Sequence, residues 1–156
     1  MKMKKFVNHI DHVTWISSPE NIEKNVATLE ALAGVKLTRF DREDMGFTMY
    51  LSWEAGLEVV TPMEKRTDFN QLLYGWLEER GEGLMGVVYG IRDLEKHKQR
   101  LEEQGFEVGP IMDDHPDSPW HHKIRLFERM GGVVMNSNFI LGDIDYSEGM
   151  IAFEDA

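Results

Sequence analysis

The sequence contains no cysteine. This absence excludes disulfides, thiolate metal ligands and cysteine nucleophiles, so any bound metal must be held by nitrogen and oxygen atoms. Long apolar runs are missing as well. The longest cover only a few residues, as in 84–89 apart from Gly86, far short of the roughly 20 residues that span a bilayer. We therefore expect no membrane partner.

Basic residues are few compared with acidic ones. Lys and Arg number 17 against 28 Asp and Glu, which gives a formal net charge of −11, and the basic residues form no contiguous stripe. This balance argues against binding along a phosphate backbone, so nucleic acid is not an expected partner. The basic start at residues 1–5 runs into Phe6-Val7-Asn8-His9 rather than an apolar signal core, and we expect a cytoplasmic protein.

Two short apolar stretches each carry one metal-capable side chain. His12 lies within residues 8–16 and Glu58 within residues 56–60. Their β-branched and apolar neighbours predict strands, where an unpaired polar group would be costly. From the residues alone two interpretations are open: a ligand site, or a private hydrogen bond between His12 and Glu58 that stabilises the sheet.

The order of predicted strands and helices occurs twice. The first set is a strand at 6–16, a helix capped by Ser18 and ended by Gly34, and strands at 35–40, 47–53 and 57–61. The second set is a strand at 84–91, a helix at 94–104, and strands near 106–111, 123–129 and 133–141, with a turn at Gly131-Gly132. The predicted fold class is α+β, one domain with two βαβββ modules. Along the chain, the domain consists of module one (6–62), a connector helix (67–80), module two (83–142) and an acidic tail (143–156).

This order, together with Ile10-Asp11-His12-Val13 and Leu57-Glu58-Val59-Val60, resembles the vicinal oxygen chelate superfamily. That superfamily includes glyoxalase I, methylmalonyl-CoA epimerase, extradiol dioxygenases, fosfomycin-resistance enzymes and bleomycin-binding proteins. The resemblance covers nearly the whole chain. It implies curved mixed sheets that form a cup around a small-molecule ligand.

The resemblance also implies a set of metal ligands. Members that use metal take ligands from the first and last strands of both modules, which assigns His12 and Glu58 as ligands and Glu58 as a possible proton carrier. In the second module, Gly86 stands where a His is expected and Asn136 where a Glu is expected. A metal held by His12, Glu58, the Asn136 side-chain oxygen and waters would be Fe(II), Mn(II) or Zn(II).

The function implied by the resemblance is a metal-assisted lyase, isomerase or ring-cleaving dioxygenase that acts on a small organic molecule with an incomplete ligand set. The alternative is a metal-free binding or resistance protein for a drug or metabolite. Candidate substrate-binding residues are Thr14, Arg125 and His122. Arg125 either holds a carboxylate or phosphate or belongs to a solvent-facing row, and His122 either reaches the pocket or lies on the surface. We also expect a homodimer, because exposed module edges would pair with a symmetric copy.

Overall fold

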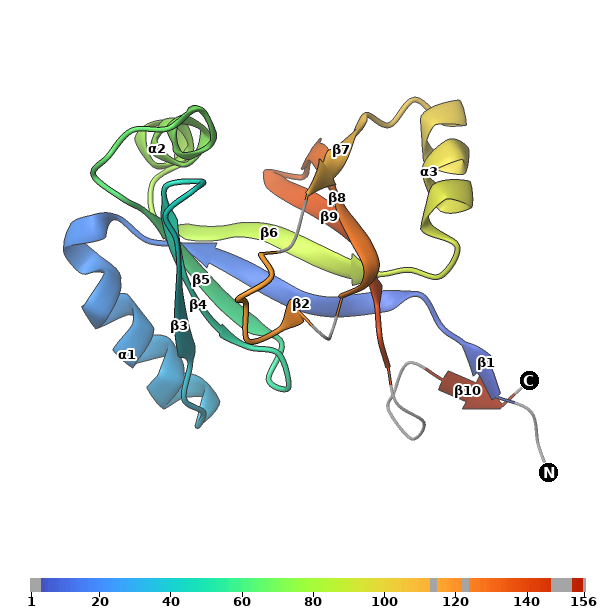
Figure 1. Ribbon diagram of the computed structural model, residues 1–156, viewed down its shortest axis with the longest axis horizontal. Coiled ribbons are helices and arrows are strands. Elements are labelled where there is room, and N and C mark those ends of the chain that lie inside the picture. Colours follow the sequence, from blue (N-terminus) through green and yellow to red (C-terminus); the bar gives the residue numbers. More distant parts are fainter. Residues whose placement is uncertain (1–3, 113–114, 122–123, 147–152, 156) are drawn as a thin grey trace. The chain divides into compact units, whose positions relative to one another are not determined.

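The computed structural model describes residues 4–112, 115–121, 124–146 and 153–155 (Figure 1). His122 lies outside the described residues, and Arg125 is described by its backbone alone. The elements are β1 (Lys4–Phe6), β2 (His9–Ile16), η1 (Pro19–Asn21), α1 (Ile22–Ala33), β3 (Thr38–Arg42), β4 (Phe47–Ser52), β5 (Leu57–Pro62), α2 (Asp68–Arg80), β6 (Gly83–Gly90), α3 (Leu94–Glu103), β7 (Val108–Met112), β8 (Ile124–Val134), β9 (Ser137–Ile144) and β10 (Phe153–Asp155).

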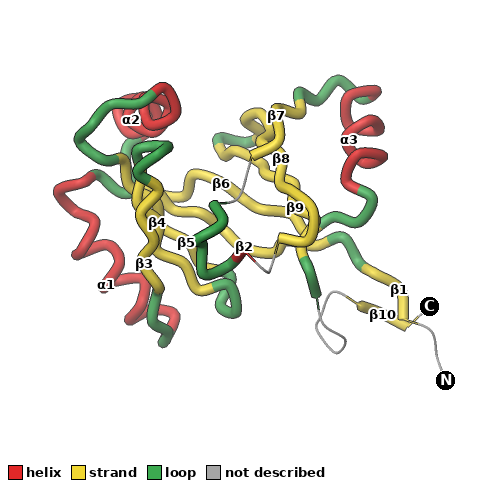
Figure 2. Tube along the Cα trace, viewed as in Figure 1, coloured by secondary structure: helices red, strands yellow, loops and turns green. Residues whose placement is uncertain are grey.

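The strands, yellow in Figure 2, form one main sheet and one separate pair. The main sheet mixes parallel and antiparallel strands. Hydrogen-bonded neighbours follow the order β3-β4-β5-β2-β6-β9-β8-β7, and β1 pairs separately with β10. β2 and β5 are parallel, whereas β4 is antiparallel to both β3 and β5. The predicted α+β class with mixed strands is confirmed. No helix among the described residues is long and apolar enough to cross a membrane.

The chain divides into two compact units, one of residues 12–86 and the other of residues 1–11 with 87–156. In the first unit, Ile16, Phe47 and Val60 of the strands pack against Leu73 and Trp76 of α2. Burying these large side chains is the main source of stability for this unit, at about 1.5–3 kcal/mol for each one fully removed from water.

The ends of α1 show which local signals the sequence carries. Gly34 follows the helix with φ 68°, and its N–H donates to Glu30 O at 2.9 Å. Glycine reaches this left-handed conformation without a steric cost, and the predicted helix end is confirmed. The predicted cap at Ser18 is wrong, because its side chain makes no capping bond and instead donates to Glu82.

The second unit corrects one predicted turn. β8 continues through Gly131 and Gly132, where its register with β9 shifts between Met130 and Val133, and the chain reverses at Met135 and Asn136, whose φ values are 49° and 61°. Gly131 has a different reason to be glycine: a Cβ there would overlap the ring of Phe139. The predicted strand at 133–141 is therefore wrong at its start, and Asn136 lies in an exposed turn.

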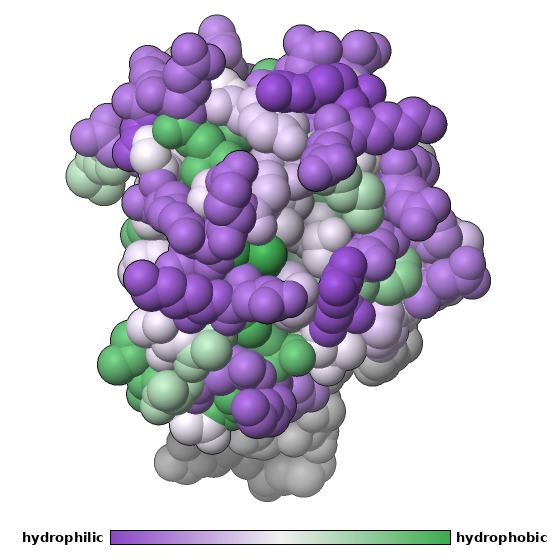
Figure 3. All heavy atoms as spheres, turned by 90° about the vertical axis from the view of Figure 1, so that its left-hand side faces the viewer, coloured by the Kyte–Doolittle hydropathy of each residue, from purple (hydrophilic) through white to green (hydrophobic). Residues whose placement is uncertain are grey.

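Hydrophilic side chains cover most of the face shown in Figure 3. Exposed polar residues are ordinary on a protein surface, whereas buried polar residues are the informative ones.

Candidate functional site

The pairing of β2 with β5 brings three predicted site residues together. The strands are parallel, with Thr14 and Glu58 as direct Cα partners. Val13 N donates to Gly56 O at 3.0 Å and fixes this register. Because side chains alternate along a strand, His12, two residues before Thr14, lies on the same face as Thr14 and Glu58.

A carboxylate lies at the centre of this group. His12 Nε2 is 3.0 Å from Glu58 Oε2, and Thr14 Oγ1 donates to the same oxygen at 3.4 Å. A carboxylate only accepts hydrogen bonds, so His12 Nε2 carries the proton and donates it. His12 and Thr14 are buried, 4% and 3% exposed, whereas the Glu58 side chain is 12% exposed. Glu58 is thus the member of the group that a ligand can reach.

Trp53, in the turn between β4 and β5, packs against this group. Its ring meets the His12 ring edge to face, with centroids 5.2 Å apart. The indole is 9% exposed, and its Nε1–H has no hydrogen-bond partner among the residues that the structure describes. No local pattern predicts this contact, since Trp53 lies in the β4–β5 turn and His12 in β2, 41 residues earlier in the chain.

The positions of the second half that correspond to His12 and Glu58 carry no equivalent polar group among the described residues. β2 and β6 have the same alternation of buried and exposed residues along their whole length, which sets His12 against Gly86. The amide after β2 donates to Val60 O at 2.9 Å, and the amide after β6 donates to Gly142 O at 2.8 Å. The residue two places before the acceptor is Glu58 in β5 and Ile140 in β9.

This register moves the predicted counterpart of Glu58 from Asn136 to Ile140. Asn136 lies at the tip of the β8–β9 hairpin, with its side chain exposed. The strand-based reason for assigning it as a metal ligand is therefore lost. Neither Gly86 nor Ile140 offers a donor atom.

A metal held by three or four side chains does not fit the described residues. No group of three or more His, Asp or Glu side chains is placed to hold an ion within them. His12 and Glu58 supply one nitrogen and one carboxylate, and the atoms that would face a metal are bonded to each other. Structural sites and most catalytic sites need at least three protein ligands.

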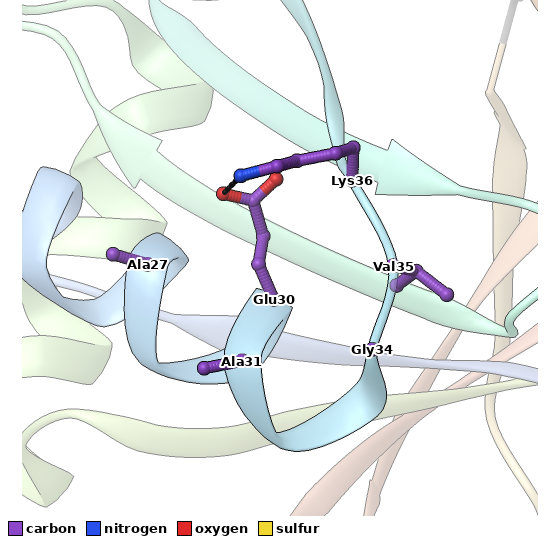
Figure 4. Close-up of a pocket in the computed structure, with 6 residues that line it drawn as sticks. All are labelled: Ala27, Glu30, Ala31, Gly34, Val35 and Lys36. Carbon is purple, nitrogen blue, oxygen red and sulfur yellow. Dashed lines mark ion pairs between the residues drawn. The ribbon is translucent and has the colours of Figure 1, made fainter.

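A separate surface depression lies at the end of α1 (Figure 4). It is lined by Ala27, Glu30, Ala31, Gly34, Val35 and Lys36. Lys36 Nζ and Glu30 Oε1 form an ion pair across it at 3.6 Å. The depression includes none of the predicted site residues.

Several solved structures share this fold. A hypothetical protein, BH1468 from Bacillus halodurans C-125, matches with TM-score 0.67 and 13% identity over 92% of this chain and 99% of its own. Methylmalonyl-CoA epimerase from Mycobacterium tuberculosis matches with TM-score 0.61 and 14% identity over 85% of each chain. Methylmalonyl-CoA epimerase (E43Q) from Streptomyces coelicolor, in complex with 2-nitronate-propionyl-CoA, matches with TM-score 0.59 and 15% identity over 88% of this chain and 97% of its own.

No family model matches the sequence, and no curated protein does. The epimerases are members of the vicinal oxygen chelate superfamily, so the resemblance predicted from the motifs is confirmed at the level of the fold. Sequence identities this low carry the fold and leave function to be argued from the site.

Proposed function

We propose that this protein is a metal-independent isomerase for a small carbonyl compound, with Glu58 as the proton carrier. The observation that supports it is the pair of His12 Nε2 and Glu58 Oε2 at 3.0 Å, with His12 buried and Glu58 partly exposed. The C–H bond next to the carbonyl breaks, its electron pair moves onto the carbonyl oxygen, and the proton goes to Glu58. The enolate then turns its other face to Glu58, and return of the proton to that face, or to another atom of the enolate, completes the isomerisation.

Proton transfer is the chemistry that a His–Glu pair performs without further partners. Metal-assisted lyase and ring-cleaving dioxygenase reactions need a fuller ligand set than His12 and Glu58 provide. Several solved structures that share the fold are methylmalonyl-CoA epimerases. In methylmalonyl-CoA, an acidic C–H bond lies next to a thioester carbonyl. We take it as the first compound to test.

The test follows the exchange of the C2 proton of methylmalonyl-CoA, and of other 2-substituted acyl thioesters, for deuterium in D2O by NMR. We expect exchange with chelator present, and a loss of at least about a hundredfold in Glu58→Gln, the scale of a general base. Glu54→Gln is the matched control, because Glu54 is an exposed carboxylate in the adjacent turn. Equal exchange in Glu58→Gln and wild type would contradict the proposal.

The second candidate is a metal-free binding protein for a small molecule. The lack of metal-ligating side chains at Gly86 and Ile140 favours it, since a site that only binds needs no metal. Tight binding of a thioester by both wild type and Glu58→Gln, with no exchange in either, would select this function over the isomerase.

A further inference from the structure

The two oxygens of Glu58 have different surroundings. Oε2 accepts hydrogen bonds from His12 Nε2 at 3.0 Å and from Thr14 Oγ1 at 3.4 Å. Within the described ranges, no residue donates to Oε1. One oxygen is therefore held by the protein, and the other keeps its lone pairs available to a ligand.

Thr14 is almost completely buried beside Glu58. It is 3% exposed, and the atom that its hydroxyl meets is Glu58 Oε2. A ligand that approaches from solvent reaches the Glu58 side chain before it reaches Thr14. This differs from the substrate-binding role predicted for Thr14 from the sequence.

We infer that Thr14 is a positioning residue, and that Oε1 of Glu58 is the atom that exchanges the proton with substrate. The inference rests on the proposed function. Two donors on one oxygen restrain rotation of the carboxylate about its Cγ–Cδ bond, so Oε1 keeps a fixed direction. With His12 as its sole anchor, the carboxylate would sample other orientations, and the reactive geometry would be populated less often.

The register of the sheet makes this arrangement rigid. Thr14 and Glu58 are direct partners across the β2–β5 pair, and the bonds from Val13 N to Gly56 O and from Ser17 N to Val60 O lie on either side of them. Neither backbone can slide without breaking these bonds. The hydroxyl of Thr14 therefore acts from a fixed point rather than from a loop.

The experiment compares Thr14→Val, Thr14→Ser and Thr61→Val in the deuterium-exchange assay with methylmalonyl-CoA. Thr61 is the matched control, because it is also buried on β5, 6% exposed, and its Oγ1 has no hydrogen-bond partner within the described part of the chain. We expect Thr14→Val to lower kcat about tenfold with KM unchanged. Thr14→Ser keeps the hydroxyl and restores most of the rate, while Thr61→Val retains the wild-type kcat.

The outcomes separate this inference from the function on which it rests. If Glu58→Gln abolishes exchange but Thr14→Val behaves like Thr61→Val, the positioning role is wrong and the proton carrier stands. A Thr14→Val defect in KM alone would make Thr14 a substrate contact and would also overturn the inference. If Glu58→Gln exchanges as fast as wild type, the proposed function itself fails.

Discussion

The carboxylate of Glu82 is the most heavily bonded side-chain acceptor in the described part of the first unit, which makes it a sharp test of the structure. Oε1 accepts from Asn21 Nδ2 at 2.9 Å. Oε2 accepts from Ser17 Oγ at 3.0 Å, from Ser18 N at 3.0 Å and Oγ at 3.2 Å, and from Asn25 Nδ2 at 2.7 Å. These bonds join the start of β6 to the end of β2 and the beginning of α1.

We expect Glu82→Gln to destabilise the protein by about 2 kcal/mol. A hydrogen bond to a charged group contributes about 1.5–3 kcal/mol when buried. Glu82 is exposed, so the released donors bond to water and only part of the summed value is lost. For a protein of this size, that loss lowers Tm by about 4–8 °C. Urea unfolding followed by circular dichroism measures it.

The matched control is Glu79→Gln. Glu79 is 73% exposed and makes one ion pair, to Arg80 Nη1 at 3.6 Å, so its loss should change stability by less than about 0.5 kcal/mol. Equal effects of Glu82→Gln and Glu79→Gln at neutral pH would show that the bonds around Glu82 are not formed in solution.

The pH dependence gives a second readout of the same bonds. The hydrogen bond from Asn21, with those from Ser18 and Ser17, holds the pKa of Glu82 below its ordinary value despite desolvation. A lowered pKa in the folded state stabilises the protein above the unfolded pKa of about 4.3 and loses that effect as the pH falls through the folded pKa. The stability difference between wild type and Glu82→Gln should therefore be full at neutral pH and shrink in acid. A difference that stays constant into strong acid would refute this reasoning.

Three further predictions concern other parts of the molecule. Gly90→Ala should cost about 2–3 kcal/mol in urea unfolding, because the added Cβ overlaps Tyr146 Oη; an unchanged midpoint would contradict that packing. Trp53→Phe should change stability by less than about 1 kcal/mol, because the substitution loses packing contacts but also removes a buried N–H that has no partner among the described residues. A loss above about 3 kcal/mol would mean that Nε1 has a hydrogen-bond partner. A homodimer remains a prediction, supported by the terminal places of β3 and β7 in the strand order; a monomer at micromolar concentration in light scattering would count against it.

Local sequence signals predicted the two central residues of the site. His12 and Glu58 stood out because each is a polar residue inside a short apolar stretch, and such residues need a partner when buried. The simplest partner was each other, and the structure places them 3.0 Å apart. Thr14 was predicted as a substrate-binding residue, and the structure places its hydroxyl against the same Glu58 oxygen at 3.4 Å.

The parts that sequence reasoning missed depend on contacts between distant segments. Gly131-Gly132 has the composition of a turn, yet Gly131 is needed because the Phe139 ring occupies the space of its Cβ. Glu82 looked like part of a helix end between two glycines, while its partners Ser17 and Asn25 are far away in the chain. Neither feature has a local pattern that identifies it.

The corrected register leads to a last prediction, about metal binding. With Asn136 as the counterpart of Glu58, the second half would supply one oxygen ligand. With Ile140 in that place it supplies none, so among the described residues the metal ligands at this site are His12 and Glu58 alone. A metal can bind to these two side chains only after the hydrogen bond between them breaks. Zn(II), Mn(II) or Fe(II) should therefore each bind with a Kd weaker than about 100 μM in calorimetric titration. Metal at about a tenth of that concentration should then raise stability by less than about 0.1 kcal/mol. Stoichiometric tight binding that His12→Ala abolishes, and that the surface variant His121→Ala leaves intact, would overturn the metal-independent mechanism and return Glu58 to the role of a metal ligand.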